Sequence, residues 1–84
     1  MRNITITISG GSKKENRRVC ERCCGQFSRG QIAQPSDPVA EQNGAYSFNV
    51  NVDGSLSNQE IADKIYPICS EGQMVSIDGT YYEE

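Results

Sequence analysis

Two stretches of alternating residues constrain the fold of this chain more than any other feature. The segment NITITIS (3–9) carries isoleucine at every second position, and AYSFNVNV (45–52) places aromatic residues and valines in the same rhythm. A period of two puts successive side chains on opposite faces of a strand, so both segments are predicted to be half-buried strands. Strands with one apolar face favour an antiparallel sheet that is covered from one side.

A first helix is expected directly after the first strand. Ser12 and Glu15 form a capping-box pattern, and the composition of residues 13–24 suits a helix. Gly25 is expected to stop this helix, because glycine is common just past a helix end.

A second helix is predicted over residues 58–69. Ser57 and Glu60 repeat the capping-box pattern, and Pro67 is expected to kink this helix or to end it early. Its apolar residues recur at helical spacing and should face the core: Ile61, Ile65 and Ile68.

The remaining segments complete a single α+β domain over residues 1–84. QMVSI (73–77) is predicted to be a strand, and Asp78-Gly79 is a hairpin signal before a short edge strand at TYY. QPSDPVAEQNG (34–44) is expected to be a loop between two halves with a similar strand–helix–strand pattern. We therefore predict a three- or four-stranded antiparallel sheet with one or two helices on one face, and with a split βαβ (ferredoxin-like) tendency.

The cysteines suggest that a metal holds this small domain together. Three of the four lie within CERCCGQF (20–27), which resembles a zinc knuckle, C-x-x-C-G followed by an aromatic residue. Cys24 departs from that pattern, because it stands between the cysteine pair and the glycine. The chain has no histidine, so the one all-cysteine tetrahedral set for a structural Zn²⁺ is Cys20, Cys23, Cys24 and Cys69.

Two alternatives compete with zinc. Cysteines are often buried as small apolar residues, and a helix over residues 13–24 would turn some of them towards the sheet. A C-x₂-C pair also occurs in redox proteins, but there it sits at the start of a helix. In a regular ferredoxin-like fold the two helices run antiparallel, which would place Cys69 near the start of the first helix and away from Cys24.

The expected location is the cytoplasm. MRNITITISGG, at the start of the chain, has no apolar run of signal-peptide length, and the sequence has no segment typical of a membrane span. We therefore expect a mature chain that begins at Met1 in a reducing cytosol, where disulfides seldom persist.

Several patterns that would indicate catalysis or nucleic-acid binding are incomplete. There is no histidine for acid–base chemistry, and no serine or cysteine has an evident base, so no catalytic residue and no enzyme activity is predicted. GSLSNQEIADKI (54–65) is similar to the first half of a helix-turn-helix, but the DNA-reading helix does not follow. SGGSKK (9–14) lacks the P-loop spacing. On the second strand, alternation assigns the aromatic residues to the buried face, which argues against base stacking there.

Charge is distributed unevenly along the chain. Residues 1–30 carry seven basic and two acidic side chains, whereas residues 31–84 carry one lysine and nine acidic side chains. Such polarity suits binding of a protein partner with a basic surface through the acidic 37–84 region and the TYYEE tail. An ordinary solvated surface explains the same numbers.

Small size, acidity, absent catalytic residues and the cysteine cluster together are similar to anti-CRISPR proteins, which are small phage-encoded inhibitors of CRISPR effectors. The resemblance implies a non-enzymatic inhibitor that binds an effector nuclease, of type II for example, and obstructs its loading with nucleic acid in the host cytoplasm. Two other functions stay open. One is a zinc-knuckle nucleic-acid binder that uses the basic segment 13–29. The other is a structural subunit of a phage or bacterial assembly.

Overall fold

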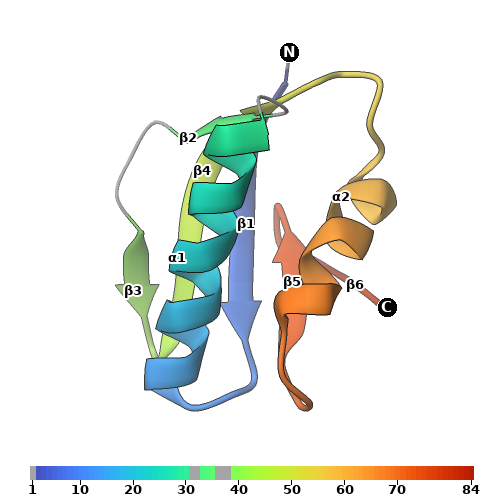
Figure 1. Ribbon diagram of the computed structural model, residues 1–84. Coiled ribbons are helices and arrows are strands. Elements are labelled where there is room, and N and C mark those ends of the chain that lie inside the picture. Colours follow the sequence, from blue (N-terminus) through green and yellow to red (C-terminus); the bar gives the residue numbers. More distant parts are fainter. Residues whose placement is uncertain (1, 31–32, 36–38) are drawn as a thin grey trace.

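The two alternating segments form the central strands of one antiparallel sheet, and both helices lie on the same face of it (Figure 1). The computed structural model describes residues 2–30, 33–35 and 39–84. Along the chain the elements are β1 (Arg2–Ser9), α1 (Lys13–Gly30), β2 (Ala33–Pro35), β3 (Ala40–Gln42), β4 (Ala45–Val52), α2 (Asn58–Ile65), the 3₁₀ turn η1 (Tyr66–Ile68), β5 (Met74–Ile77) and β6 (Thr80–Tyr82).

The strand order is β2-β4-β1-β5-β6. Strands β2 and β3 both pair with the outer edge of β4, β2 with its end and β3 with its start. Strand β1 lies between β4 and β5 and is antiparallel to both, so β4 and β5 run parallel and α2 connects them. Strand β4 likewise lies between β1 and β2 and is antiparallel to both, so β1 and β2 run parallel and α1 connects them. The α+β class, the antiparallel sheet and the helices on one face are confirmed. The sheet exceeds the expected three or four strands because β2, β3 and β6, each only three residues long, extend its edges.

Helix α1 does not stop at Gly25, as the sequence predicted, but continues to Gly30. Phe27 explains the difference, because it lies one turn after Cys23 on the buried face and is only 4% exposed. Its ring packs edge-to-face against Phe48 of β4, with 6.3 Å between the ring centroids. Burial of an aromatic ring contributes about 2 to 3 kcal/mol, which outweighs the roughly 1 kcal/mol cost of glycine inside a helix.

The segment 34–44, expected to be a loop, contains parts of two strands. Ala33–Pro35 and Ala40–Gln42 form strands because they pair with the outer edge of β4. The turn residues near these segments do not reveal such a long-range contact. Residues 36–38 lie outside the described residues. The Asn-Gly signal at its end does form a turn, because Asn43 and Gly44 have φ values of 54° and 86° and join β3 to β4. Two positive φ values are what a tight type I′ hairpin needs.

Most of the C-terminal predictions are confirmed, but Ile68, which was expected to face the core on the second helix, lies in a 3₁₀ turn and is only half-buried. Ser57 and Glu60 form a reciprocal capping box at the start of α2. The helix ends at Ile65, and Pro67 lies in the 3₁₀ turn that follows it. Asp78 and Gly79, with φ values of 51° and 85°, form the turn between β5 and β6.

The core lies between the sheet and the two helices. The alternating isoleucines of β1 and the apolar residues of β4 face the helices, as their period predicted. The largest fully buried side chains among the described residues are Ile4, Ile6, Ile8, Val19, Cys20, Cys23, Val50, Val52, Ile61, Ile65, Val75 and Ile77. Among the helices of the described residues, none has the length and apolar character that crossing a membrane requires.

A buried amide on α1 connects three turns of the fold. The Oδ1 atom of Asn16 accepts hydrogen bonds from the backbone N–H of Gly11 and from the Nε2 group of Gln73, both at 3.1 Å. Its Nδ2 group donates to the carbonyl oxygens of Gly11 at 3.1 Å and Gly44 at 2.9 Å. Gln73 in turn accepts from the N–H of Ser70 at 2.7 Å. The network fixes the turns before α1, before β4 and before β5 against one another.

Tight packing in this network explains the glycine pair of SGGSKK. A Cβ atom on Gly10 would lie 2.4 Å from the carbonyl oxygen of Gly72, and one on Gly11 would lie 3.0 Å from Oδ1 of Asn16. The glycines therefore allow the turn to approach the β5 side of the sheet. Since the N–H of Gly11 is already bonded to Asn16, the segment acts as a turn and a helix cap.

Replacing Asn16 by alanine should lower the free energy of unfolding by about 2 to 4 kcal/mol, because buried donors and acceptors from Gly11, Gly44 and Gln73 lose their partner. Urea denaturation followed by circular dichroism measures the change. Gln26→Ala on the exposed face of α1 is the control, with an expected change within about 0.5 kcal/mol. Equal stability of the Asn16→Ala and control variants would contradict this role.

Candidate functional site

Helix α1 positions three of the four cysteines that the sequence proposed as metal ligands. Cys20 and Cys23 lie one turn apart on the face that also carries Val19 and Phe27, and both are fully buried. Their neighbours are the apolar side chains of the core. In this position the two cysteines pack as small apolar residues of the core.

Burial keeps these two thiols protonated. It raises the pKa of Cys20 far above its ordinary value, and it raises the pKa of Cys23 to about 12. Arg22 has the opposite effect on the pKa of Cys23, but burial dominates. Zinc binds the thiolate, so both residues would have to ionise in an apolar environment before they could act as ligands.

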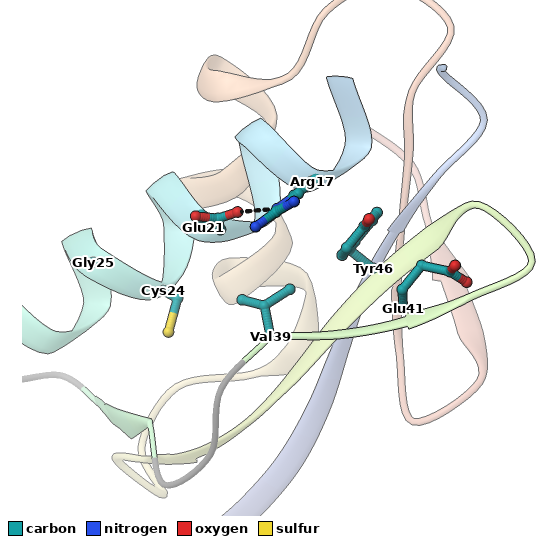
Figure 2. A pocket seen from close by; sticks show the side chains of 7 residues that line it. All are labelled: Arg17, Glu21, Cys24, Gly25, Val39, Glu41 and Tyr46. Atoms are coloured by element: carbon teal, nitrogen blue, oxygen red, sulfur yellow. Dashed lines mark hydrogen bonds and ion pairs between the residues drawn. The ribbon is translucent and has the colours of Figure 1, made fainter. Parts of the chain in front are cut away.

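Cys24 and Cys69 are partly exposed and line different hollows. Cys24 and Val39 line a groove of about 590 Å³ between α1 and the β3–β4 hairpin (Figure 2). Cys69 follows η1 and lines a second hollow of about 340 Å³ with Glu71 and Glu84. Burial raises the pKa of both thiols.

All four cysteines are free thiols, and the described part of the chain contains no group of three or more cysteine, aspartate or glutamate side chains arranged to hold a metal ion. Zinc binding by Cys20, Cys23, Cys24 and Cys69 therefore stays a prediction. Cys20 and Cys23 face the core, whereas Cys24 and Cys69 line two different hollows, so binding of one ion by all four requires their side chains to rearrange.

The groove beside Cys24 has mixed charge. Arg17 Nε donates to Glu21 Oε1 at 2.7 Å (Figure 2). On the opposite wall of the groove, Glu41 pairs with Lys13 at 3.3 Å. Tyr46 lies between the two walls. Each charged side chain that lines the groove thus has a partner of opposite charge. This neutralised lining gives the groove no charge preference for a ligand.

The ion pairs divide the surface into two regions. Near α1, each of the carboxylates Glu15, Glu21 and Glu41 is paired with Arg18, Arg17 or Lys13. Around α2 and the C-terminus the carboxylates are different. Five of them are exposed, and within the described residues none forms an ion pair: Glu60, Asp63, Glu71, Glu83 and Glu84. We call these five residues the acidic surface.

Contacts of the C-terminal tail bring four of these five residues together. The side-chain amide of Gln59 donates to Asp63 Oδ1 at 3.0 Å and to the carbonyl oxygen of Glu83 at 2.7 Å, which holds the tail against α2. Glu84 then lines the same hollow as Glu71. Sequence alone showed the acidic composition of this half, but only the packing of the tail on α2 gathers these residues in one place.

Sequence reasoning missed one further surface. The side chains of Met74 and Tyr81 are 45% and 62% exposed, the largest apolar groups on the described surface. Tyr81 lies opposite Ser76 in the β5–β6 pair, and Met74 shares that face two residues away. Both therefore lie on the sheet face that the helices leave uncovered. Alternation along β5 and β6 was the available signal, but both strands are too short for a period of two to be clear.

The protein is thus an α+β protein with a half-covered antiparallel sheet. No protein-family model matches the chain, and no curated protein and no solved structure matches it significantly.

Raising the pH above about 9 should destabilise the fold through the buried thiols. In the unfolded chain Cys20 and Cys23 ionise near their ordinary pKa of 9.0, whereas burial raises the pKa of both in the folded chain. Below about pH 9 the two neutral thiols make their full contribution to the free energy of unfolding. Between about pH 9 and pH 11 this contribution falls by up to about 1.4 kcal/mol per pH unit for each thiol. Urea denaturation at a series of pH values measures the slope.

The Cys20→Ala/Cys23→Ala variant provides the control. It should be less stable at every pH because two core side chains become smaller. Its stability should nevertheless fall less steeply above about pH 9, since two of the titrating groups are gone. Parallel curves for the two proteins would show that these thiols are not buried in the neutral form.

Proposed function

We propose that this protein is a non-enzymatic binding protein whose acidic surface docks onto a basic region of a protein partner. The observation that carries the proposal is the contrast between the two sides of the molecule. The carboxylates near α1 are neutralised by lysine or arginine, whereas the five carboxylates of the acidic surface have only Lys64 among them. Unpaired like charges raise the energy of the free protein, and a basic partner relieves that repulsion.

The partner chemistry suggests a nucleic-acid enzyme. Such enzymes hold their substrate in positively charged channels, and the channel of a CRISPR effector nuclease contacts mainly the nucleic-acid backbone. A small protein with an acidic surface competes for the same charges. We therefore propose an anti-CRISPR role in the cytoplasm of a phage-infected cell, in which the protein blocks nucleic-acid loading of the effector.

The fold proposal is a ferredoxin-like arrangement. Its support is the strand order β2-β4-β1-β5 together with the two interleaved strand–helix–strand units, β1–α1–β2 and β4–α2–β5. In this arrangement α2 and the C-terminal strand lie side by side, which accounts for the position of the acidic surface at one end of the sheet.

A second candidate function is nucleic-acid binding by the basic side of α1. Lys14 and Arg22 are exposed and, within the described residues, have no acidic partner. Three neighbouring basic residues are engaged with carboxylates, so a phosphate would have to compete with existing ion pairs: Lys13, Arg17 and Arg18.

Structural zinc is the remaining part of the proposal, and elemental analysis decides it. Protein purified without a histidine tag is compared with the Cys69→Ser variant. Zinc at about one equivalent in the natural sequence, and sharply less in the variant, would support a four-cysteine site. A metal-free, folded protein would leave the four cysteines as thiols.

Charge reversal on α2 tests the docking proposal. Asp63→Lys is expected to weaken binding to a type II CRISPR effector nuclease by about 10-fold or more at low salt, because it replaces an attraction by a repulsion. Biolayer interferometry with the guide-free effector measures the affinity, and inhibition of target DNA cleavage reports the consequence. Asp63 is an exposed helical residue, so the fold should not change.

Glu21→Lys is the matched control, because it makes the same charge change at an exposed helical position on the other side of the molecule. Equal affinity of the two variants, or no binding of the natural sequence to the effector, would refute docking through the acidic surface. A DNA titration at two salt concentrations tests the second candidate. Steeply salt-dependent binding that Arg22→Glu abolishes would favour nucleic-acid recognition.

A further inference from the structure

The face of the sheet opposite the helices carries no charged side chain within the described strands. Register and alternation assign its residues, which are small and polar apart from one methionine and one tyrosine: Asn3, Thr5, Thr7 and Ser9 on β1, Ala45, Ser47, Asn49 and Asn51 on β4, Ala40 and Gln42 on β3, Met74 and Ser76 on β5, and Tyr81 on β6. We call this the open face. Charged residues are 23% of the chain, so their absence from these strand positions distinguishes the open face from the rest of the surface. A carboxylate borders it at the β5–β6 turn, where Asp78 Oδ1 accepts a hydrogen bond from the backbone N–H of Thr5 at 2.9 Å.

From this composition we propose that the open face is the interface of a homodimer, in which two copies of the chain pack sheet against sheet. Interface centres are depleted in charged residues, and tyrosine and methionine are enriched there. Met74 and Tyr81, exposed by 45% and 62%, supply the apolar anchors.

The side chains of the open face suit contact with an identical surface. Thr5 Oγ1 donates to Asn49 Oδ1 at 2.6 Å, and Asn3 Nδ2 donates to Asn51 Oδ1 at 3.1 Å. These bonds hold the side chains in an ordered array across β1 and β4. Asparagine, serine and threonine each retain donors and acceptors after these bonds, so two copies of the same face can bond to each other.

Electrostatics favours a second copy over a basic partner at this face. Each chain has a net charge of −3, and two such chains repel each other wherever their charged surfaces meet. Contact through an uncharged face places the helices, and the charges on them, on the outer sides of the dimer. A basic partner, in contrast, is attracted to the acidic surface and gains no charge interaction at the open face.

The size of the face predicts a weak dimer. A strand residue covers about 16 Å² of sheet, which gives about 420 Å² per copy for β1, β3, β4, β5 and β6. The total of about 840 Å² is below the size of most stable interfaces, so the dissociation constant should be on the order of 10 to 100 µM.

Sedimentation equilibrium over about 5 to 500 µM tests the proposal. The natural sequence should show a reversible monomer–dimer equilibrium. Ser47→Arg, at the centre of the open face, should weaken dimerisation by about 10-fold or more, because two buried positive charges would meet or lose hydration. Gln26→Arg adds the same charge on the exposed side of α1 and should leave the equilibrium unchanged.

Tyr81→Ala keeps the test decisive if Ser47→Arg fails to fold, since Tyr81 is mostly exposed and its loss should weaken the dimer without unfolding the chain. A natural sequence that stays monomeric throughout, or a dimer that neither variant weakens, would overturn the proposal. If the natural sequence stays monomeric and Ser47→Arg loses binding to the effector, the open face binds that partner and not a second copy. This result would also overturn the dimer proposal. Dimerisation should survive Asp63→Lys, so this test and that of the docking proposal are independent.

Discussion

The side chain of Asn16 ties the start of α1 to the turns at the ends of three paired strands, β1, β4 and β5. Its amide lies at the start of α1, 2% exposed, and bonds to Gly11, Gly44 and Gln73. One residue thereby fixes the entry into the first helix, the hairpin before β4 and the turn before β5. Every hydrogen-bonding atom of this amide has a partner, so burial of the polar group specifies one arrangement of the turns. The distribution of charged surfaces depends on that arrangement.

The half-covered sheet separates two kinds of surface. The helices contribute most of the charged side chains and lie on one face, while the other face displays hydroxyl and amide groups. On the helix side the two helices differ again, because the carboxylates near α1 are paired and those near α2 are not. The proposed docking of a basic protein and the proposed self-association would therefore use different surfaces, and a dimer would present two acidic surfaces at once. Two such surfaces raise the effective affinity for a partner with repeated basic sites.

The parts of the fold that sequence predicts are those that local chemistry determines. Period-two alternation identified β1 and β4, the capping box identified the start of α2, and Asp78-Gly79 identified the last hairpin, because each pattern acts over a few residues. The errors arose where distant contacts decide. Phe27 continues α1 beyond Gly25 by packing on Phe48, and β4 draws two short strands out of the expected loop 34–44.

The candidate metal site illustrates the same limit for electrostatics. Arginines lie next to the cysteines in sequence, and a nearby cation lowers the pKa of a thiol, but neighbours in sequence lie about 100° apart around a helix. Arg17, Arg18 and Arg22 consequently point to solvent, while Cys20 and Cys23 enter the core. Their charges act across a hydrated surface, whereas burial acts on the thiols directly, so desolvation decides the sign of the pKa shift. A run of basic and thiol residues therefore predicts thiolate chemistry only where both kinds of side chain share one face of the helix.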